Sequence, residues 1–206
     1  MDEHSLELHL PYLWKRLEQT FGADSSTFPP IVPILVGDGS CEQEKSIGKL
    51  LAPFLKDPEN AFIVSSDFCH WGSRFRYRPH LTDGVIRNMD DRGSESSLEL
   101  RSETLEKMAG PQGLPIHEVI RVLDEMAMDT IKTGVHAAFY NTVQETQNTV
   151  CGRHPIGVVV AALEMLKKDG LEKEKGLFRF VQYQRSNLVE SSRDFSVSYV
   201  SAYAVV

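Results

Sequence analysis

The sequence predicts an α/β fold, with a sheet flanked by helices, from three observations. Strand-like and helical segments alternate in the first part of the chain, and two more strand-like segments close it. Apolar residues make up 41% of the 206 residues, which is enough for the buried core of one domain. We therefore expect residues 1–206 to form a single domain.

The first four elements are predicted as helix, strand, helix and strand. Leucines at three- and four-residue steps predict a helix over residues 5–21, which Pro11 either kinks or begins. Apolar runs predict strands at 31–36 and 61–66, and the second run is uninterrupted, as in a strand covered on both faces. Between them, amphipathic spacing predicts a helix over 42–55.

The middle of the chain differs in composition from the rest. Residues 79–114 contain many serines, acidic residues and glycines and few large apolar side chains. We predict a flexible, solvent-exposed insertion here, and a phosphorylation target is the alternative.

The remaining elements follow from periodicity. Helices are predicted over 116–133, 135–144 and 156–166, and strand-like runs cover 177–184 and 195–205.

Composition excludes several classes of protein. The formal net charge of −7 argues against a non-specific nucleic-acid binder, and no apolar run approaches the roughly 20 residues that cross a bilayer. The first residues are acidic and do not resemble a secretory signal. Three widely spaced cysteines without a Cys-x-x-Cys pair indicate reduced thiols in the cytoplasm or nucleus and no zinc ribbon.

Reactive side chains follow directly after the run at 61–66. Because ligands collect beyond the carboxyl ends of strands in α/β sheets, Asp67 and His70 are candidate site residues. Histidine transfers protons near neutral pH, and Asp67, three residues away, could orient its ring. The alternative is that Asp67 caps the loop and His70 satisfies a backbone carbonyl.

The next residues alternate between arginines and aromatic side chains. If the segment is extended, Arg74 and Arg76 lie with Arg78 on one face, suited to a phosphate or carboxylate, and Phe75 and Tyr77 lie on the other. The alternative is a charged rim.

Weaker candidates lie elsewhere in the chain. Cys151 and His154 form a Cys-x-x-His turn that could bind a soft or borderline metal, and a buried cysteine beside a helix cap is the alternative. His4 and Glu7 share a helix face, as either a cleft-facing pair or a solvated helix start. Cys41 is predicted to be a packing residue and His136 to be incidental.

Four segments in order along the chain resemble the Memo family, named for mediation of growth-factor-receptor-driven cell motility. They are residues 3–12 (EHSLELHLPY), 62–77 (FIVSSDFCHWGSRFRY), 148–157 (NTVCGRHPIG) and 196–199 (SVSY). The resemblance covers nearly the whole chain except the predicted insertion.

The resemblance implies a fold similar to class III extradiol dioxygenases, which hold non-haem iron with two histidines and a carboxylate. It implies that Cys151 stands at the carboxylate position and that His70, with Asp67 beside it, matches the catalytic base. It also implies a signalling protein that binds phosphopeptides and copper or iron and acts in cell motility and growth control. The ligand-binding residues expected on this basis are Trp71, Arg74, Phe75, Arg76, Tyr77, Arg153, His154, His4 and Glu7.

One departure from the family limits these expectations. The two histidine ligands of the family lie in an N-terminal half that this sequence does not contain, so we expect an N-terminally incomplete fold. Its missing strands would leave an unpaired sheet edge. We expect a non-catalytic adaptor that binds a phosphotyrosine or other peptide or a redox metal. The alternatives are an extradiol-type oxidoreductase, which cysteine in place of a hard carboxylate disfavours, and an inactive fragment.

Overall fold

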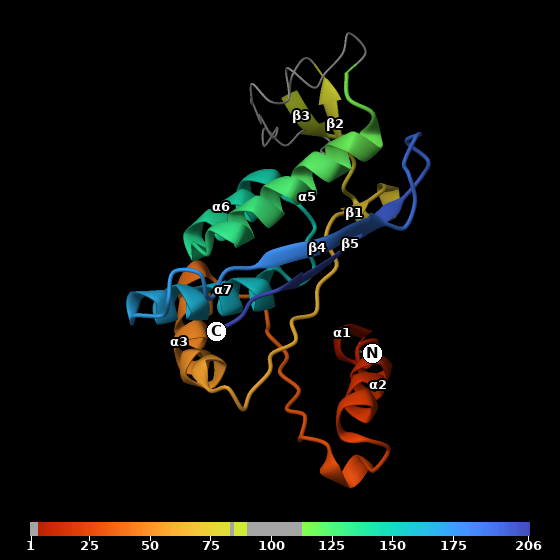
Figure 1. Ribbon diagram of the computed structural model, residues 1–206. Helices are drawn as coiled ribbons and strands as arrows, with labels where there is room; N and C mark the ends of the chain where they lie inside the picture. The colour runs from red at the N-terminus through yellow and green to blue at the C-terminus, as the bar shows by residue number, and fades with distance from the viewer. Residues whose placement is uncertain (1–3, 83–84, 90–112) are drawn as a thin grey trace.

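The computed structural model describes residues 4–82, 85–89 and 113–206. These residues contain helices and two small antiparallel sheets joined by irregular segments, so the predicted α/β class is confirmed (Figure 1). None of the helices described here has the length and apolar character needed to cross a membrane.

Capping residues, proline and glycine set the ends of several helices. The α-helices are α1 (His4–Glu7), α2 (Leu10–Phe21), α3 (Cys41–Lys56), α5 (Ile116–Thr133), α6 (His136–Thr146) and α7 (Arg153–Lys168). A capping box formed by Ser40 and Gln43 starts α3, and Pro11 lies in the first turn of α2. Gly134, at a φ of 68°, ends α5 in the left-handed conformation that glycine tolerates. Figure 1 shows α1 and α2 standing apart from the other helices.

The sheets are formed by late strands and by a central hairpin. One sheet has the order β1 (His70–Trp71), β5 (Ser196–Tyr203), β4 (Arg179–Arg185), and both of its pairings are antiparallel. The other is a hairpin of β2 (Pro79–Thr82) and β3 (Val85–Asn88).

The predicted strands at 31–36 and 61–66 are wrong. Both segments are irregular, and neither pairs with a strand in the part of the chain that the structure describes. Val32 is 77% exposed and Ile63 is 58% exposed, so nothing covers them as a buried strand would be covered. An apolar run becomes a strand only where a neighbouring strand completes its backbone hydrogen bonds.

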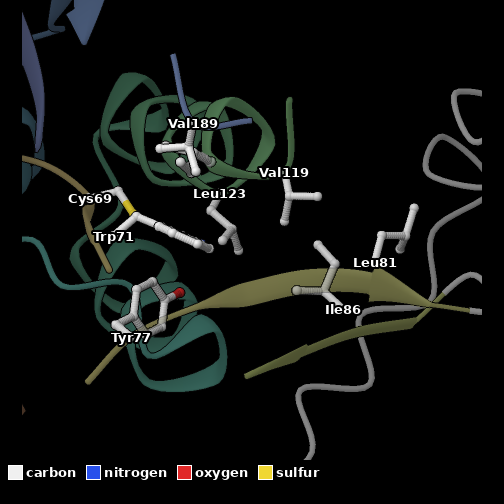
Figure 2. Close-up of a cluster of buried hydrophobic side chains, with 9 residues drawn as sticks. Cys69, Trp71, Tyr77, Leu81, Ile86, Val119, Leu123 and Val189 are labelled. Atoms are coloured by element: carbon white, nitrogen blue, oxygen red, sulfur yellow. The ribbon is translucent and has the colours of Figure 1, made fainter. Parts of the chain in front are cut away.

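Part of the predicted insertion is ordered. The β2–β3 hairpin lies inside residues 79–114, and Leu81 and Ile86 pack against Val119 and Leu123 of α5, as Figure 2 shows. This burial differs from the solvated character that we expected. Residues 90–112 lie outside the described residues, and for them a flexible insertion stays a prediction.

The long helices cover the sheet and each other. A buried cluster of α5, α6 and α7 side chains packs beside β4 and β5, and it includes Ile131, Phe139 and Val160. Helices α3 and α7 approach closely at Gly48, where an added Cβ would lie 2.8 Å from the Val158 carbonyl oxygen.

A buried carboxylate joins the helices to the sheet. Asp124 of α5 is 0% exposed, and its Oδ1 accepts the backbone N–H of Cys69 at 3.0 Å and the side-chain amide of Asn148 at 3.0 Å. Its Oδ2 accepts the hydroxyl of Tyr183 in β4 at 2.9 Å. Burial raises the pKa of Asp124, and these hydrogen bonds oppose that rise.

We predict that Asp124→Ala lowers the free energy of unfolding by about 3 kcal/mol, because two buried donors and one partly buried donor lose their acceptor. Urea denaturation measures this loss. The matched control is Asp129→Ala on the same helix, which removes an exposed ion pair with Lys132 and is expected to cost less than about 0.5 kcal/mol. Equal losses for the two variants would contradict a special role for Asp124.

Candidate functional site

Two loops that lie far apart in the sequence run side by side at the start of β1. The N–H of Cys151 donates to the Asp67 carbonyl at 3.2 Å, and the N–H of Asp67 donates to the Cys151 Sγ at 3.1 Å. The N–H of Gly152 donates to the Ser66 Oγ at 2.9 Å. A Cβ on Gly152 would lie 2.4 Å from the Ser66 Cβ, so only glycine allows this approach. The fold therefore brings Asp67 and Cys151 together across 84 residues.

The imidazole of His70 is held from two sides. Its Nδ1 lies 2.9 Å from the Phe68 carbonyl and 3.0 Å from the Thr149 carbonyl, so Nδ1 carries a proton and donates. Its Nε2 lies 3.7 Å from the Asp67 Oδ2. Both alternatives considered for His70, the carboxylate and the backbone carbonyl, are therefore present.

The nearby Asp67 carboxylate raises the pKa of His70 above the ordinary 6.5. Burial opposes this rise, and the carbonyls of Thr149 and Phe68 support it. The stability that this pair contributes is therefore present at a pH below the ordinary pKa and is lost as the pH rises through the raised value.

An arginine lies on aromatic rings next to His70. The Phe75 ring contacts the His70 ring edge-on, with centroids 5.1 Å apart. The exposed guanidinium of Arg74 lies 4.4 Å from the Phe75 centroid and 4.1 Å from the Phe195 centroid. We call His70, Arg74, Phe75 and Phe195 the arginine shelf. It presents a cation to solvent in a geometry that cation–π attraction favours.

The alternation of residues 73–78 does not form an extended segment, so that expectation is wrong. Ser73–Phe75 is a 3₁₀ helix, and Arg76 follows in the left-handed region at a φ of 54°. Gly72, at a φ of 138°, starts this turn. The guanidinium groups of residues 74, 76 and 78 therefore do not share one strand face. Arg76 is exposed.

Trp71 and Tyr77, for which ligand contact stays a prediction, belong to the core. Both are buried, and Figure 2 shows them among the apolar side chains of this cluster. The indole of Trp71 donates to the Pro79 carbonyl at 3.1 Å, and the Tyr77 hydroxyl donates to the Thr146 carbonyl at 2.8 Å. Both side-chain N–H and O–H groups therefore already donate to backbone carbonyls.

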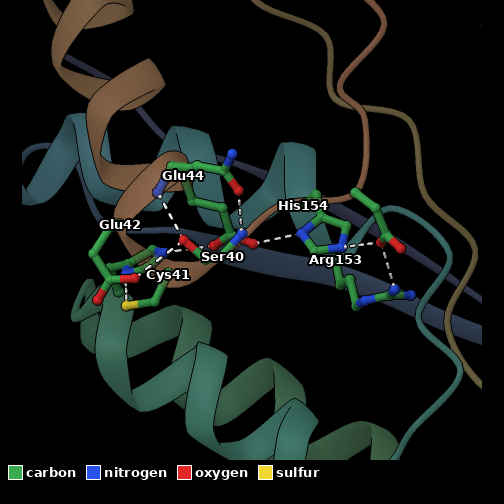
Figure 3. A network of polar contacts seen from close by, with 9 residues as sticks. Ser40, Cys41, Glu42, Glu44, Arg153 and His154 are labelled. Carbon is green, nitrogen blue, oxygen red and sulfur yellow. Dashed lines mark hydrogen bonds and ion pairs between the residues drawn. The ribbon is translucent and has the colours of Figure 1, made fainter.

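Arg153 and His154 face a different set of partners from Cys151. His154 is buried, with Nδ1 2.6 Å from Glu44 Oε1 and Nε2 2.6 Å from Asp38 Oδ1. Arg153 also donates to Asp38 Oδ1, at 2.9 Å (Figure 3). These ion pairs occupy the two side chains that we expected to bind a ligand.

His4 and Glu7 are exposed on α1. Among the described residues, neither side chain is hydrogen-bonded to Asp67, His70 or Cys151. Their predicted ligand contact stays a prediction.

The described residues do not fit a three-ligand metal centre. No group of three histidine, cysteine or acidic side chains within them is arranged to hold an ion. The exposed thiol of Cys151 and the Nε2 of His70 are the donors that this loop pair could offer.

Sequence reasoning missed Phe195, Thr149 and Asp124. Phe195 and Thr149 contact His70 or Arg74 only after folding, and Asp124 lies within an ordinary amphipathic helix pattern. A local spacing rule cannot identify these residues.

We predict that Asp67→Asn lowers the pKa of His70, because the neutral amide no longer favours the imidazolium. Titration of the ring protons by NMR measures the pKa. Asp57→Asn, which changes an exposed carboxylate after α3, is the control and should leave the His70 titration unchanged. An unaltered pKa in Asp67→Asn would mean that the backbone carbonyls alone set it.

Comparison with known proteins gives a consistent match. The family model described as Memo-like protein matches residues 1–203. Protein MEMO1 of Homo sapiens and Protein MEMO1 of Danio rerio are each 38% identical over 205 residues, covering 100% of this chain and 57% of the relative. The memo-1 homolog of Caenorhabditis elegans is 36% identical over 204 residues, covering 99% of this chain and 48% of the relative. The chain thus spans about half the length of these relatives.

Proposed function

Because this chain belongs to the Memo-like protein family, we propose that it is a binding protein without turnover that recognises a phosphorylated peptide. One observation carries the proposal: the exposed guanidinium of Arg74 lies over Phe75 and Phe195 beside His70. Guanidinium groups bind phosphate through paired, charge-assisted hydrogen bonds. A role as a signalling adaptor in cell motility and growth control would follow from such binding.

Two features support an anionic ligand over a neutral one. The pKa of His70 is raised, so its imidazolium offsets the charge of the neighbouring Asp67 carboxylate, which would otherwise repel an anion. Arg76, two residues after Arg74, is also exposed and adds a second positive charge to this turn. The rings of the arginine shelf restrict the Arg74 side chain, which reduces the entropy lost on binding.

The proposed compartment is the cytoplasm or nucleus. The three cysteines are free thiols, as in proteins kept under reducing conditions.

A redox metal is the second candidate ligand. The thiol of Cys151 lies beside Asp67, and thiolate with imidazole favours a soft ion such as copper(I) over iron. Among the described residues, no third histidine, cysteine or acidic side chain completes a metal site with these two groups. Metal binding would therefore need a further ligand.

We predict that Arg74→Ala combined with Arg76→Ala weakens binding of a phosphotyrosine peptide by about tenfold or more, which corresponds to losing one charge-assisted hydrogen bond. Isothermal titration calorimetry with the phosphorylated peptide and its unphosphorylated twin measures the effect. The loss is expected to be larger for the phosphorylated peptide.

The control is Arg179→Ala, which removes an exposed arginine from β4 and should leave both affinities unchanged. If both peptides lose affinity equally in the double variant, the arginines act through packing and phosphate recognition is rejected.

We predict that Cys151→Ser lowers the copper content of protein loaded with copper(I), because serine replaces a soft donor with a hard one. Elemental analysis after gel filtration measures the metal. His117→Gln, which removes an imidazole from the start of α5, is the control. Equal copper content in wild-type protein and Cys151→Ser would reject Cys151 as a ligand.

A further inference from the structure

A second cluster of reactive side chains, separate from the arginine shelf, lies at the start of α3. Cys41 is the first residue of α3, Glu44 follows one turn later, and His136 is the first residue of α6. The Nε2 of His136 lies 2.6 Å from the Glu44 Oε2, and its Nδ1 lies 3.8 Å from the Cys41 Sγ. Figure 3 shows Cys41 and Glu44 within this network.

The Glu44 carboxylate determines which nitrogen of His136 carries the proton and which one can accept a proton from Cys41. Because a carboxylate only accepts, Nε2 must donate its proton to Glu44, and the lone pair of a neutral ring is then on Nδ1, toward Cys41. His136 is 0% exposed and Glu44 is 3% exposed. The backbone N–H of His136 also donates to the Glu164 Oε2 at 3.0 Å. The ring is therefore fixed in the orientation that accepts a proton from sulfur.

Glu44 is held by a second histidine. Its Oε1 lies 2.6 Å from the Nδ1 of His154, whose Nε2 faces Asp38. Both ring nitrogens of His154 thus face carboxylate oxygens, which hold the Glu44 side chain in place from the side opposite His136. Gly157 leaves room for this carboxylate, because a Cβ there would lie 2.1 Å from the Glu44 Oε2.

Thiol, imidazole and carboxylate in this order form the arrangement that activates cysteine nucleophiles. Cys41 also lies in the first turn of the 16-residue helix α3. Its side chain is only partly exposed, so a small molecule reaches the sulfur more readily than a protein substrate does.

We propose that Cys41, His136 and Glu44 form a nucleophilic thiol site that reacts with small hydroperoxides. The Cys41 S–H bond breaks, and its proton moves to the Nδ1 of His136. The sulfur then forms a bond to one peroxide oxygen, and the O–O bond breaks. The sulfur takes the OH oxygen of the peroxide, and the other oxygen leaves with the proton from His136, as water from hydrogen peroxide or as an alcohol from an organic hydroperoxide. Sulfur loses two electrons to become a sulfenic acid, and the peroxide gains two.

The other two cysteines lack this arrangement and serve as internal references. Cys69 is fully buried, and burial raises the pKa of its thiol. Cys151 is the exposed cysteine, and its sulfur accepts the N–H of Asp67. Neither sulfur is hydrogen-bonded to an imidazole within the described residues.

The test is the rate of oxidation of each cysteine by hydrogen peroxide, with sulfenic acid trapped by dimedone and quantified by peptide mass spectrometry. His136→Gln is expected to slow trapping at Cys41 by at least about tenfold, the effect of losing a general base. The rate at Cys151 should change by less than about twofold, because its surroundings are unaltered. Equal Cys41 rates in wild-type protein and His136→Gln overturn the proposal.

Cys69 reports whether the variant is folded, because it is trapped only if the core opens. If His136→Gln does expose Cys69, the order of oxidation in wild-type protein decides instead. Exposure alone would make Cys151 react before Cys41. Faster trapping at Cys41 supports the proposal, and equal or slower trapping rejects it.

Discussion

The buried carboxylate of Asp124 is the interaction on which the candidate site depends. It binds the backbone at Cys69, next to His70, and the side chain of Asn148, in the loop that leads to Cys151. Its third bond, from Tyr183, ties both loops to the sheet. A buried carboxylate is tolerated only where its oxygens are satisfied, so a shift of either loop would leave charge and donors unpaired. The hydrogen bonds of Asp124 thus help to hold the loops that carry His70 and Cys151.

Glu44 joins three helices through buried hydrogen bonds, as Asp124 joins the two loops of the candidate site. From α3, it contacts His136 at the start of α6 and His154 at the start of α7. These contacts fix the starts of both helices against α3. The glycines at 48 and 157 let α3 and α7 come close enough for these contacts. A side chain at position 157 would collide with the Glu44 carboxylate and move it away from His136 and His154. The close packing of α3 on α7 and the hydrogen bonds of Glu44 therefore depend on each other.

Sequence patterns predicted what depends on near neighbours along the chain. The helix expected at 116–133 has the bounds of α5, because apolar spacing within one helix is sufficient to define it. The strands expected at 31–36 and 61–66 failed, because pairing depends on a partner that a local pattern cannot reveal. Likewise Asp67, His70 and Cys151 could be singled out as reactive types, but Phe195 and the buried role of Trp71 emerge only from long-range contacts.

The turn from Cys151 to His154 contacts neighbours of the arginine shelf at one end and the Cys41 cluster at the other. Cys151 pairs with Asp67 beside the arginine shelf, and three residues later His154 is fixed between Asp38 and Glu44. Gly152, wedged against Ser66, leaves this turn little room to move. A change in charge at Glu44 would alter the bond that anchors His154 and would act on a turn whose other end holds Cys151. This turn is therefore the structural link between the Glu44 contacts and the loop beside the arginine shelf.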